Sequence, residues 1–185
     1  MNMHNKRSFL STQPWILPAG FLLAGILAKW GTFGTFPLSV GMGDTPFKNW
    51  IGTLQDMPSV FKKIDPEWML TTEQRKYHCR GCPLGCGAIV AFESLQLKES
   101  HRPEYETTAA FTTMLLNDNL ELVYELNELC NRAGLDTISA GSAVAFAMEC
   151  YERGWITAHD TGGIELNWGN AAAMRQVVQQ MIARQ

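Results

Sequence analysis

A short loop that carries three cysteines constrains the fold of this chain more than any other segment. Cys79, Cys82 and Cys86 follow one another at the spacing C-x₂-C-x₃-C, and glycines at positions 81, 85 and 87 lie between and after them. Sequence this rich in glycine is poor material for a helix or a packed strand. We therefore expect an irregular loop that can place its sulfur atoms and backbone N–H groups around a small inorganic centre, because thiolate is the ligand that iron–sulfur clusters and zinc prefer.

The spacing alone leaves three interpretations of the cysteine loop open. In the first, the three thiolates bind a [4Fe–4S] cluster whose fourth ligand comes from a distant residue. In the second, they form a structural zinc site that His78, Cys130 or Cys150 completes, although zinc sites more often carry a second cysteine pair roughly 12 to 20 residues later. In the third, they are buried free thiols. Cys130 and Cys150 fall on apolar helical faces, where core packing is the ordinary role of a free cysteine.

Length, charge and cysteine usage narrow the class of protein. A chain of 185 residues can bury its own core. A net charge of −3 and the lack of any basic run argue against a surface for nucleic acid or for an anionic membrane. Five cysteines, three of them close together, suit metal binding in a reducing compartment better than a disulfide framework. We therefore expect a cytoplasmic protein that binds no nucleic acid.

Residues 1–29 form an apolar N-terminal segment that allows three interpretations. Its apolar run from Trp15 to Ala28 follows Lys6 and Arg7, as in a signal peptide or a membrane anchor. The run is short for a membrane span, which takes roughly 20 residues, and Pro18 with two glycines weakens it as a helix. The alternatives are a surface that packs against protein absent from this chain and a gene-boundary artefact.

Hydrophobic periodicity in the second half of the chain predicts three helices. Asp118 or Asn119 caps a helix that Gly134 ends, Ser139 to Arg153 forms a second helix, and Asn170 caps a third. The apolar positions expected to face inward recur at intervals of three and four: Leu122, Val123, Leu126, Leu129 and Cys130 in the first helix, Val144, Phe146, Ala147 and Cys150 in the second, and Met174, Val177, Val178, Met181 and Ile182 in the third. Residues 156–168, between the last two helices, alternate enough for a short strand or hairpin.

The first half gives weaker signals. Residues 31–50 are rich in Gly, Thr and Pro and are expected to be irregular. Pro58 suits the start of a helix, and its expected buried face is Val60, Phe61 and Ile64. Thr71-x-x-Gln74 matches a capping box for a short helix that leads into the cysteine loop. The pattern as a whole predicts a mainly α, multihelical domain with a cysteine-rich loop and little strand.

Two polar motifs allow a structural and a functional interpretation each. Glu104 and Glu106 are either a solvated pair or include a carboxyl group that moves protons, placed by the neighbouring proline and tyrosine. In Asn131–Thr137, Gly134 can end one helix and Asp136 or Thr137 can cap the next. Alternatively, the exposed amides of the second helix, together with Asp136, hold a polar ligand.

Several segments, in the right order, resemble the tungsten-containing aldehyde:ferredoxin oxidoreductase family. The resemblance covers residues 30–185, and its elements are Gly43–Trp50, the loop Cys79–Gly87, Pro103–Thr107, Asn127–Gly141 and Ala145–Glu149. Gly43–Thr45, within the first of these elements, and Gly162–Gly169 are similar to the branch that includes the tungsten subunit of class II benzoyl-CoA reductase.

The resemblance implies that residues 30–185 are the middle, α-helical domain of a larger enzyme. Family members hold tungsten, or molybdenum, between two pterins beside one [4Fe–4S] cluster that passes electrons to ferredoxin, and they typically oxidise an aldehyde to a carboxylic acid. Cys79, Cys82 and Cys86 would be three cluster ligands. In the family the fourth ligand belongs to a later domain, and the pterins are surrounded by an N-terminal domain. This chain lacks both domains. We therefore expect the fragment to be inactive alone.

Further site residues follow from the resemblance. Glu104 occupies the position of an acidic residue that assists proton transfer near the metal. The pterin motif D-x-x-G-L-D falls on Asn131, Gly134, Leu135 and Asp136. Asn131 replaces the leading Asp, so one charge-assisted hydrogen bond to the pterin is not carried over. An E-x-x-H iron site found in some members has no counterpart, because Glu125-Leu-Asn-Glu128 lacks the histidine.

The resemblance also implies partners: the missing domains of the same enzyme, and ferredoxin or another electron-transfer subunit. An alternative function from a different class is a small non-enzymatic iron–sulfur electron carrier or a zinc-binding module. In that case Cys130 or Cys150 would supply the fourth ligand.

Overall fold

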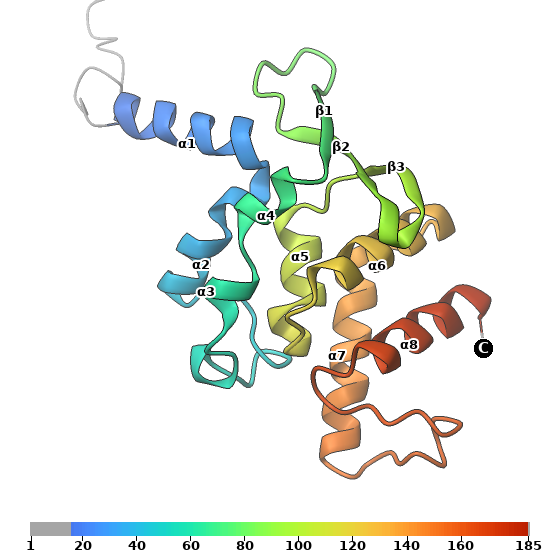
Figure 1. The fold of residues 1–185 in the computed structure, drawn as a ribbon. Coiled ribbons are helices and arrows are strands. Elements are labelled where there is room, and N and C mark those ends of the chain that lie inside the picture. Colours follow the sequence, from blue (N-terminus) through green and yellow to red (C-terminus); the bar gives the residue numbers. More distant parts are fainter. Residues whose placement is uncertain (1–15, 185) are drawn as a thin grey trace, which may run out of the picture.

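The computed structural model describes residues 16–184 and shows a group of helices with a small sheet at one edge (Figure 1). The helices are α1 (Ile16–Trp30), α2 (Phe36–Met42), α3 (Val60–Lys63), α4 (Pro66–Leu70), α5 (Tyr105–Phe111), α6 (Leu120–Ala133), α7 (Thr137–Glu152) and α8 (Ala171–Ala183). Short 3₁₀ helices lie at Thr32–Thr35, Leu54–Asp56, Glu93–Leu95 and Thr113–Leu115. The expectation of a mainly α, multihelical domain with little strand is confirmed.

Local capping chemistry sets the bounds of the three long C-terminal helices, as predicted. The side chains of Asn119, Asp136 and Asn170 accept hydrogen bonds from backbone N–H groups in the first turns of α6, α7 and α8. Gly134, with φ of 70°, ends α6 in the left-handed conformation that glycine adopts at least cost. These caps satisfy backbone groups that the helices leave without partners.

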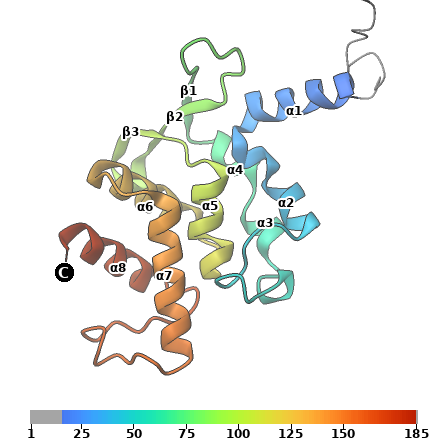
Figure 2. The same ribbon diagram turned by 180° about the vertical axis from the view of Figure 1, so that it is seen from behind.

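The core is one continuous cluster of buried side chains, to which the N-terminal elements and the helices α5, α6, α7 and α8 all contribute. Figures 1 and 2 both show α5 and α7 running side by side, and a Cβ at Gly141 of α7 would lie 2.8 Å from the Ala110 carbonyl oxygen of α5. The helices therefore approach closely through small residues. The largest fully buried side chains include Phe33, Phe36, Phe111, Leu115, Leu122, Tyr124, Leu126, Met148 and Met174.

The three strands form one antiparallel sheet in the order β1–β2–β3, with β1 at Glu73–Tyr77, β2 at Gly87–Phe92 and β3 at Leu97–His101. The short helix predicted from the capping box at Thr71 is therefore wrong, because Glu73–Tyr77 pairs with the apolar strand β2. Tertiary pairing overrides a weak local helix signal here. The side chain of Thr72 instead contacts Tyr124, with the two hydroxyl oxygens 3.0 Å apart.

Two aromatic side chains predicted to be buried are exposed. Phe61 is 51% exposed and Phe146 is 60% exposed, so both predictions are wrong. On α3, Val60 and Ile64 share one face, and Phe61 lies about 100° around the helix from Val60. On α7 the buried face is made of Ala140, Gly141, Val144, Ala145 and Met148, and Phe146 points away from it.

Two segments differ from the expected local structure. Residues 156–168 contain no strand; they form successive turns, in which the Asp160 side chain accepts hydrogen bonds from the backbone N–H and hydroxyl of Thr157. Residues 31–50, predicted to be irregular, include the 3₁₀ helix Thr32–Thr35 and all of α2. Helix α2 forms because a proline stands in its first turn and buried Phe36 and Val40 anchor it to the core.

The apolar N-terminal segment is a helix over Ile16–Trp30. Phe21, Leu22 and Leu23 are 76%, 69% and 48% exposed, and both views show α1 extending away from the other helices (Figures 1 and 2). Among residues 16–184, no helix is at once long enough and apolar enough to cross a membrane. Residues 1–15, which contain the basic pair of the signal-peptide interpretation, lie outside the described residues.

Candidate functional site

The cysteine loop spans residues 78–86 and joins the end of β1 to the start of β2. Tyr77 and Gly87 are paired across the two strands, so the ends of the loop are held together. Inside the loop the Cys82 N–H donates to the Cys79 carbonyl oxygen at 3.0 Å. The loop is therefore a closed turn on a hairpin rather than a flexible connection.

Glycine is required at the base of this loop. Gly85 has a φ of 61°, and a Cβ there would lie 2.6 Å from the imidazole ring of His78. A Cβ at Gly87 would overlap the ring of Tyr77. The glycines thus let the backbone pass under two rings, which explains the sequence pattern that first marked the loop.

The donor chemistry of the loop fits an iron–sulfur cluster. Cys79 is exposed and Cys82 and Cys86 are half-buried, so the three thiols are reachable, and no side chain of residues 78–86 belongs to the hydrophobic core. Within residues 16–184 no three His, Cys, Asp or Glu side chains already converge closely enough to hold a metal ion. The sulfur atoms would therefore gather only on binding, as metal binding and local ordering are coupled.

Cys130 and Cys150 are buried in α6 and α7, as expected for core cysteines. Burial, helped by the charge of Asp136, raises the pKa of the Cys130 thiol to about 11. A thiol that keeps its proton is a poor metal ligand, because thiolate is the binding form. This environment disfavours Cys130 as the fourth ligand of a self-contained metal module.

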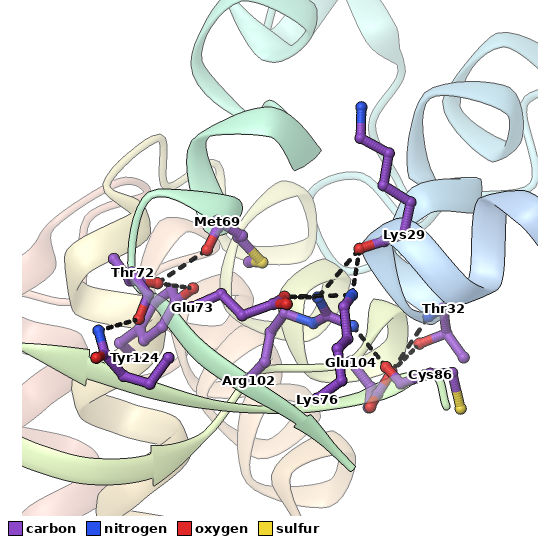
Figure 3. Close-up of polar contacts among 11 residues, drawn as sticks. Lys29, Thr32, Met69, Thr72, Glu73, Lys76, Cys86, Arg102, Glu104 and Tyr124 are labelled. Atoms are coloured by element: carbon purple, nitrogen blue, oxygen red, sulfur yellow. Dashed lines mark hydrogen bonds and ion pairs between the residues drawn. The ribbon is translucent and has the colours of Figure 1, made fainter. Parts of the chain in front are cut away.

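Arg102 joins the base of the cysteine loop to the sheet and to α1 (Figure 3). Its side chain is 0% exposed. Nη1 donates to the Glu73 carboxylate at 2.7 Å and to the Lys29 carbonyl oxygen at 3.5 Å, and Nη2 donates to the Cys86 carbonyl oxygen. Lys76 Nζ donates to the same Lys29 carbonyl and lies 3.3 Å from Glu73. Two cations thus meet the C-terminal end of α1, where the helix dipole favours positive charge.

Glu104 is half-buried and held by hydrogen bonds, whereas Glu106 is exposed. Glu104 Oε2 accepts from the Thr32 hydroxyl at 2.5 Å and from the Thr32 N–H at 3.2 Å. The same hydroxyl accepts from the Tyr105 N–H at 2.8 Å. The carboxyl group is therefore fixed in place at the start of α5, and the interpretation of the two glutamates as a solvated pair does not hold for Glu104.

A pocket of about 490 Å³ brings two of the expected site residues together. It is lined by Tyr77, His101, Arg102, Glu104, Thr107, Asn127 and Asn131. Glu104 lies at the start of α5 and Asn131 in the last turn of α6, and the pocket meets the cysteine loop at Tyr77 and Arg102. Two pockets of about 570 and 530 Å³ lie elsewhere, around Trp68 and Phe61, and contain none of the expected site residues. The candidate site is therefore the pocket of about 490 Å³, because it is the one of the three that contains Glu104 and Asn131.

The pocket wall is a connected polar network. His101 Nδ1 lies 3.0 Å from the Tyr77 hydroxyl, and Asn127 Nδ2 donates to the His101 carbonyl oxygen at 3.1 Å. Burial raises the pKa of Tyr77, and the charges of Glu104 and the nearby cysteines add to the effect. Glu104 and Asn131 were expected site residues, and Thr107 and Asn127 lie within segments that carry the family resemblance. Tyr77, His101 and Arg102 were not predicted. The signal for Tyr77 and Arg102 was position, since each stands two residues before an expected site residue.

The remaining residues of the expected pterin motif lie at the corner between α6 and α7. The Gly134 N–H donates to the Asn131 carbonyl, and the Leu135 N–H donates to the Cys130 carbonyl at 2.9 Å, which is the pairing of a Schellman cap. Asp136 accepts from the Ser139 N–H at 2.6 Å, and hydrogen bonds from Ser139 lower its pKa. Only Asn131 of this motif lines the pocket.

Comparison with known proteins identifies the family of the chain. Residues 20–185 match the family model described as "Aldehyde ferredoxin oxidoreductase, domains 2 & 3". The chain is 35% identical over 111 residues to the tungsten-containing aldehyde ferredoxin oxidoreductase of Thermococcus kodakarensis, across 60% of this chain and 18% of that protein. It is 31% identical over 164 residues to the aliphatic sulfonate oxidoreductase, WOR-like subunit, of Pyrococcus furiosus, across 85% of this chain and 25% of that protein.

The matched region extends from within α1 to the end of the chain, and it contains both the cysteine loop and the polar pocket. The chain spans a quarter or less of the length of these curated relatives. Their similarity confirms the resemblance seen in the ordered motifs: the chain belongs to the aldehyde ferredoxin oxidoreductase family.

Proposed function

We propose that residues 30–185 form the middle domain of a tungstopterin and iron–sulfur oxidoreductase. The observation that carries this proposal is the pocket in which Glu104 and Asn131 meet beside the base of the cysteine loop. The complete enzyme would oxidise an aldehyde and pass the electrons to ferredoxin or to another electron-transfer subunit. The names of the relatives support the tungsten and the aldehyde, and one of them indicates a sulfonate instead.

Cys79, Cys82 and Cys86 would supply three thiolate ligands to a [4Fe–4S] cluster, which transfers single electrons when bound. Their accessibility and their position on a closed loop support this role. The fourth thiolate would come from a domain outside this chain. Cys130 and Cys150 are too deeply buried in helices to reach the loop without unpacking them.

The polar pocket would form one wall of the pterin and tungsten (or molybdenum) site. Its amide, hydroxyl and imidazole groups offer the mixed donors and acceptors that a polar heterocycle requires. The amide of Asn131 would bind the pterin as a neutral group, and Gly134, Leu135 and Asp136 would hold the corner that positions it.

Glu104 would assist proton transfer near the reacting centre. Thr32 occupies its Oε2 atom with two hydrogen bonds, whereas its Oε1 atom accepts none from residues 16–184. We assign the exchangeable proton to Oε1, because a carboxyl group held by one oxygen keeps its second oxygen in a fixed direction.

A cytoplasmic location and the absence of nucleic-acid binding belong to the same proposal. Exposed thiols that bind iron need a reducing compartment, and the net charge of −3 disfavours nucleic acid. The missing domains of the enzyme would be the principal partners. By itself, the chain should not oxidise aldehydes.

The test is anaerobic purification and reconstitution with iron and sulfide, followed by metal and sulfide analysis and by EPR of the reduced protein. We expect sub-stoichiometric, oxygen-sensitive iron that Cys82→Ser abolishes and Cys150→Ser leaves unchanged. Loss of iron in folded Cys130→Ser or Cys150→Ser would instead favour the self-contained electron carrier. Stoichiometric zinc would favour a structural site.

Activity gives a second test of the fragment. The purified chain, assayed with an aldehyde and a viologen dye, should reduce no dye, because neither the pterins nor the fourth cluster ligand has its full set of partners. Measurable oxidation by the chain alone would contradict the proposal that other domains are needed.

A further inference from the structure

Arg102 is a buried charge that core packing does not explain. Its side chain is 0% exposed, its carboxylate partner Glu73 is 16% exposed, and its Nε atom has no hydrogen-bond partner among residues 16–184. Burying a guanidinium group is costly even when it is paired. The burial of this charge therefore indicates that Arg102 has a role other than packing the core.

The position of Arg102 is set by the sheet. Its backbone N–H donates to the Ala88 carbonyl oxygen at 2.9 Å, which continues the pairing of β3 with β2 by one residue. The side chain then reaches back along β2 to the Cys86 carbonyl oxygen, at the last residue of the cysteine loop. The backbone on both sides of this contact is therefore fixed.

A glycine covers the same contact from the other side. Gly31 has a φ of 68°, and a Cβ there would lie 2.5 Å from Arg102 Nη2 and 2.9 Å from the Cys86 carbonyl oxygen. The backbone after α1 therefore lies directly against the guanidinium group. Close packing of this kind excludes water and strengthens the electrostatic effect of the charge.

The charges around Arg102 are unevenly placed. Arg102 and Lys76 both meet the carboxylate of Glu73 and the C-terminal end of α1, and Glu104 lines the same pocket as Arg102. Nη2 is the guanidinium nitrogen that faces the loop, and Nη1 faces Glu73. Within this group it is the positive charge of Arg102 that contacts the backbone of Cys86 directly.

We propose that Arg102 is a positioning residue for the metal centre of the cysteine loop, and that its charge raises the reduction potential of a cluster bound there. The proposal rests on the proposed function of the loop. The hydrogen bond to the Cys86 carbonyl would fix the backbone that carries that thiolate, and a nearby positive charge stabilises the reduced, more negative form of a cluster.

The first measurement is a Co²⁺ titration of the whole chain under reducing, anaerobic conditions, followed by the thiolate-to-cobalt charge-transfer absorption. Arg102→Met should weaken Co²⁺ binding about 10- to 100-fold, the usual cost of losing a group that orients a metal ligand. Arg75→Met is the matched control, because Arg75 lies on the same hairpin in an exposed ion pair with Glu99. It should bind Co²⁺ like the wild type.

Two further variants separate position from charge. Arg102→Lys keeps the charge but loses the forked contact, so it should weaken Co²⁺ binding while changing the potential of a reconstituted cluster less than Arg102→Met does. Gly31→Ala forces the guanidinium group away from Cys86 without removing it and should also weaken Co²⁺ binding. This variant keeps the test valid if Arg102→Met fails to fold, which circular dichroism would show.

The second measurement is an EPR-monitored redox titration of the reconstituted chain, in which Arg102→Met should lower the cluster potential. Wild-type Co²⁺ affinity in folded Arg102→Met and Gly31→Ala, or an unchanged potential, would overturn the inference while leaving the cluster loop intact. A wild-type chain that gives no charge-transfer band and no cluster would overturn the proposed function and this inference with it.

Discussion

Thr32 connects the turn after α1 to α5, and replacing it by valine tests how Glu104 is held. The threonine hydroxyl donates to Glu104 Oε2 at 2.5 Å and accepts from the Tyr105 N–H at 2.8 Å. Valine has nearly the same shape, so Thr32→Val removes these two hydrogen bonds and leaves the packing in place. The Thr32 N–H still donates to the carboxylate at 3.2 Å.

The expected cost of Thr32→Val follows from the two lost bonds. A hydrogen bond to a charged group contributes about 1.5–3 kcal/mol, and a backbone N–H left without an acceptor costs about 1–3 kcal/mol. The site is only partly buried, so water replaces some of each interaction. We therefore expect the free energy of unfolding to fall by about 2–3 kcal/mol.

Thr35→Val is the matched control, because the Thr35 hydroxyl makes one ordinary bond, to the Thr32 carbonyl oxygen at 2.8 Å. Its loss should cost about 1 kcal/mol. Urea unfolding followed by circular dichroism measures both variants. If Thr32→Val costs no more than Thr35→Val, the carboxyl group of Glu104 is not held as described, and its assignment as a fixed proton carrier fails.

Three further outcomes are expected. In the native protein at pH 8, iodoacetamide should modify exposed Cys79 and spare Cys130, whose buried thiol has a pKa of about 11; peptide mapping that finds equal modification would contradict this environment. Gly87→Ala should destabilise the hairpin by about 1–3 kcal/mol through overpacking against Tyr77, whereas Gly41→Ala, with open space around its Cβ, should not destabilise the protein in the same urea assay. Asp136→Ala should lower the urea midpoint at pH 7. Because hydrogen bonds from Ser139 lower the pKa of Asp136 from 3.8, the difference from the wild type should be full above that value and shrink as the pH falls through the lowered pKa; a difference that stays constant as the pH is lowered would exclude the carboxylate cap as its cause.

Local chemistry made part of this fold predictable from sequence. The caps at Asn119, Asp136 and Asn170 and the stop at Gly134 are decided within one helical turn, and the structure has them where the sequence places them. The cysteine loop was recognisable for the same reason, since three thiols and their glycines lie within nine residues.

Features that depend on distant partners were not predictable in this way. Strand β1 reads as polar sequence, and only its pairing with β2 makes it a strand. The outward direction of Phe146 depends on which face of α7 meets α5. Likewise Arg102 became part of the site only when the sheet brought it against Cys86. A single sequence carries no direct record of these contacts.

The way in which the hairpin closes the cysteine loop has a consequence for how the protein matures. The strand pair Tyr77–Gly87 fixes the ends of the loop, and none of the loop side chains supports the hydrophobic core. If the loop binds metal as proposed, metal binding and folding of the domain would then be separate events. We expect a chelator to remove metal from the loop while the helices stay folded, so that a folded domain could lose its iron to oxygen and be reloaded without new synthesis.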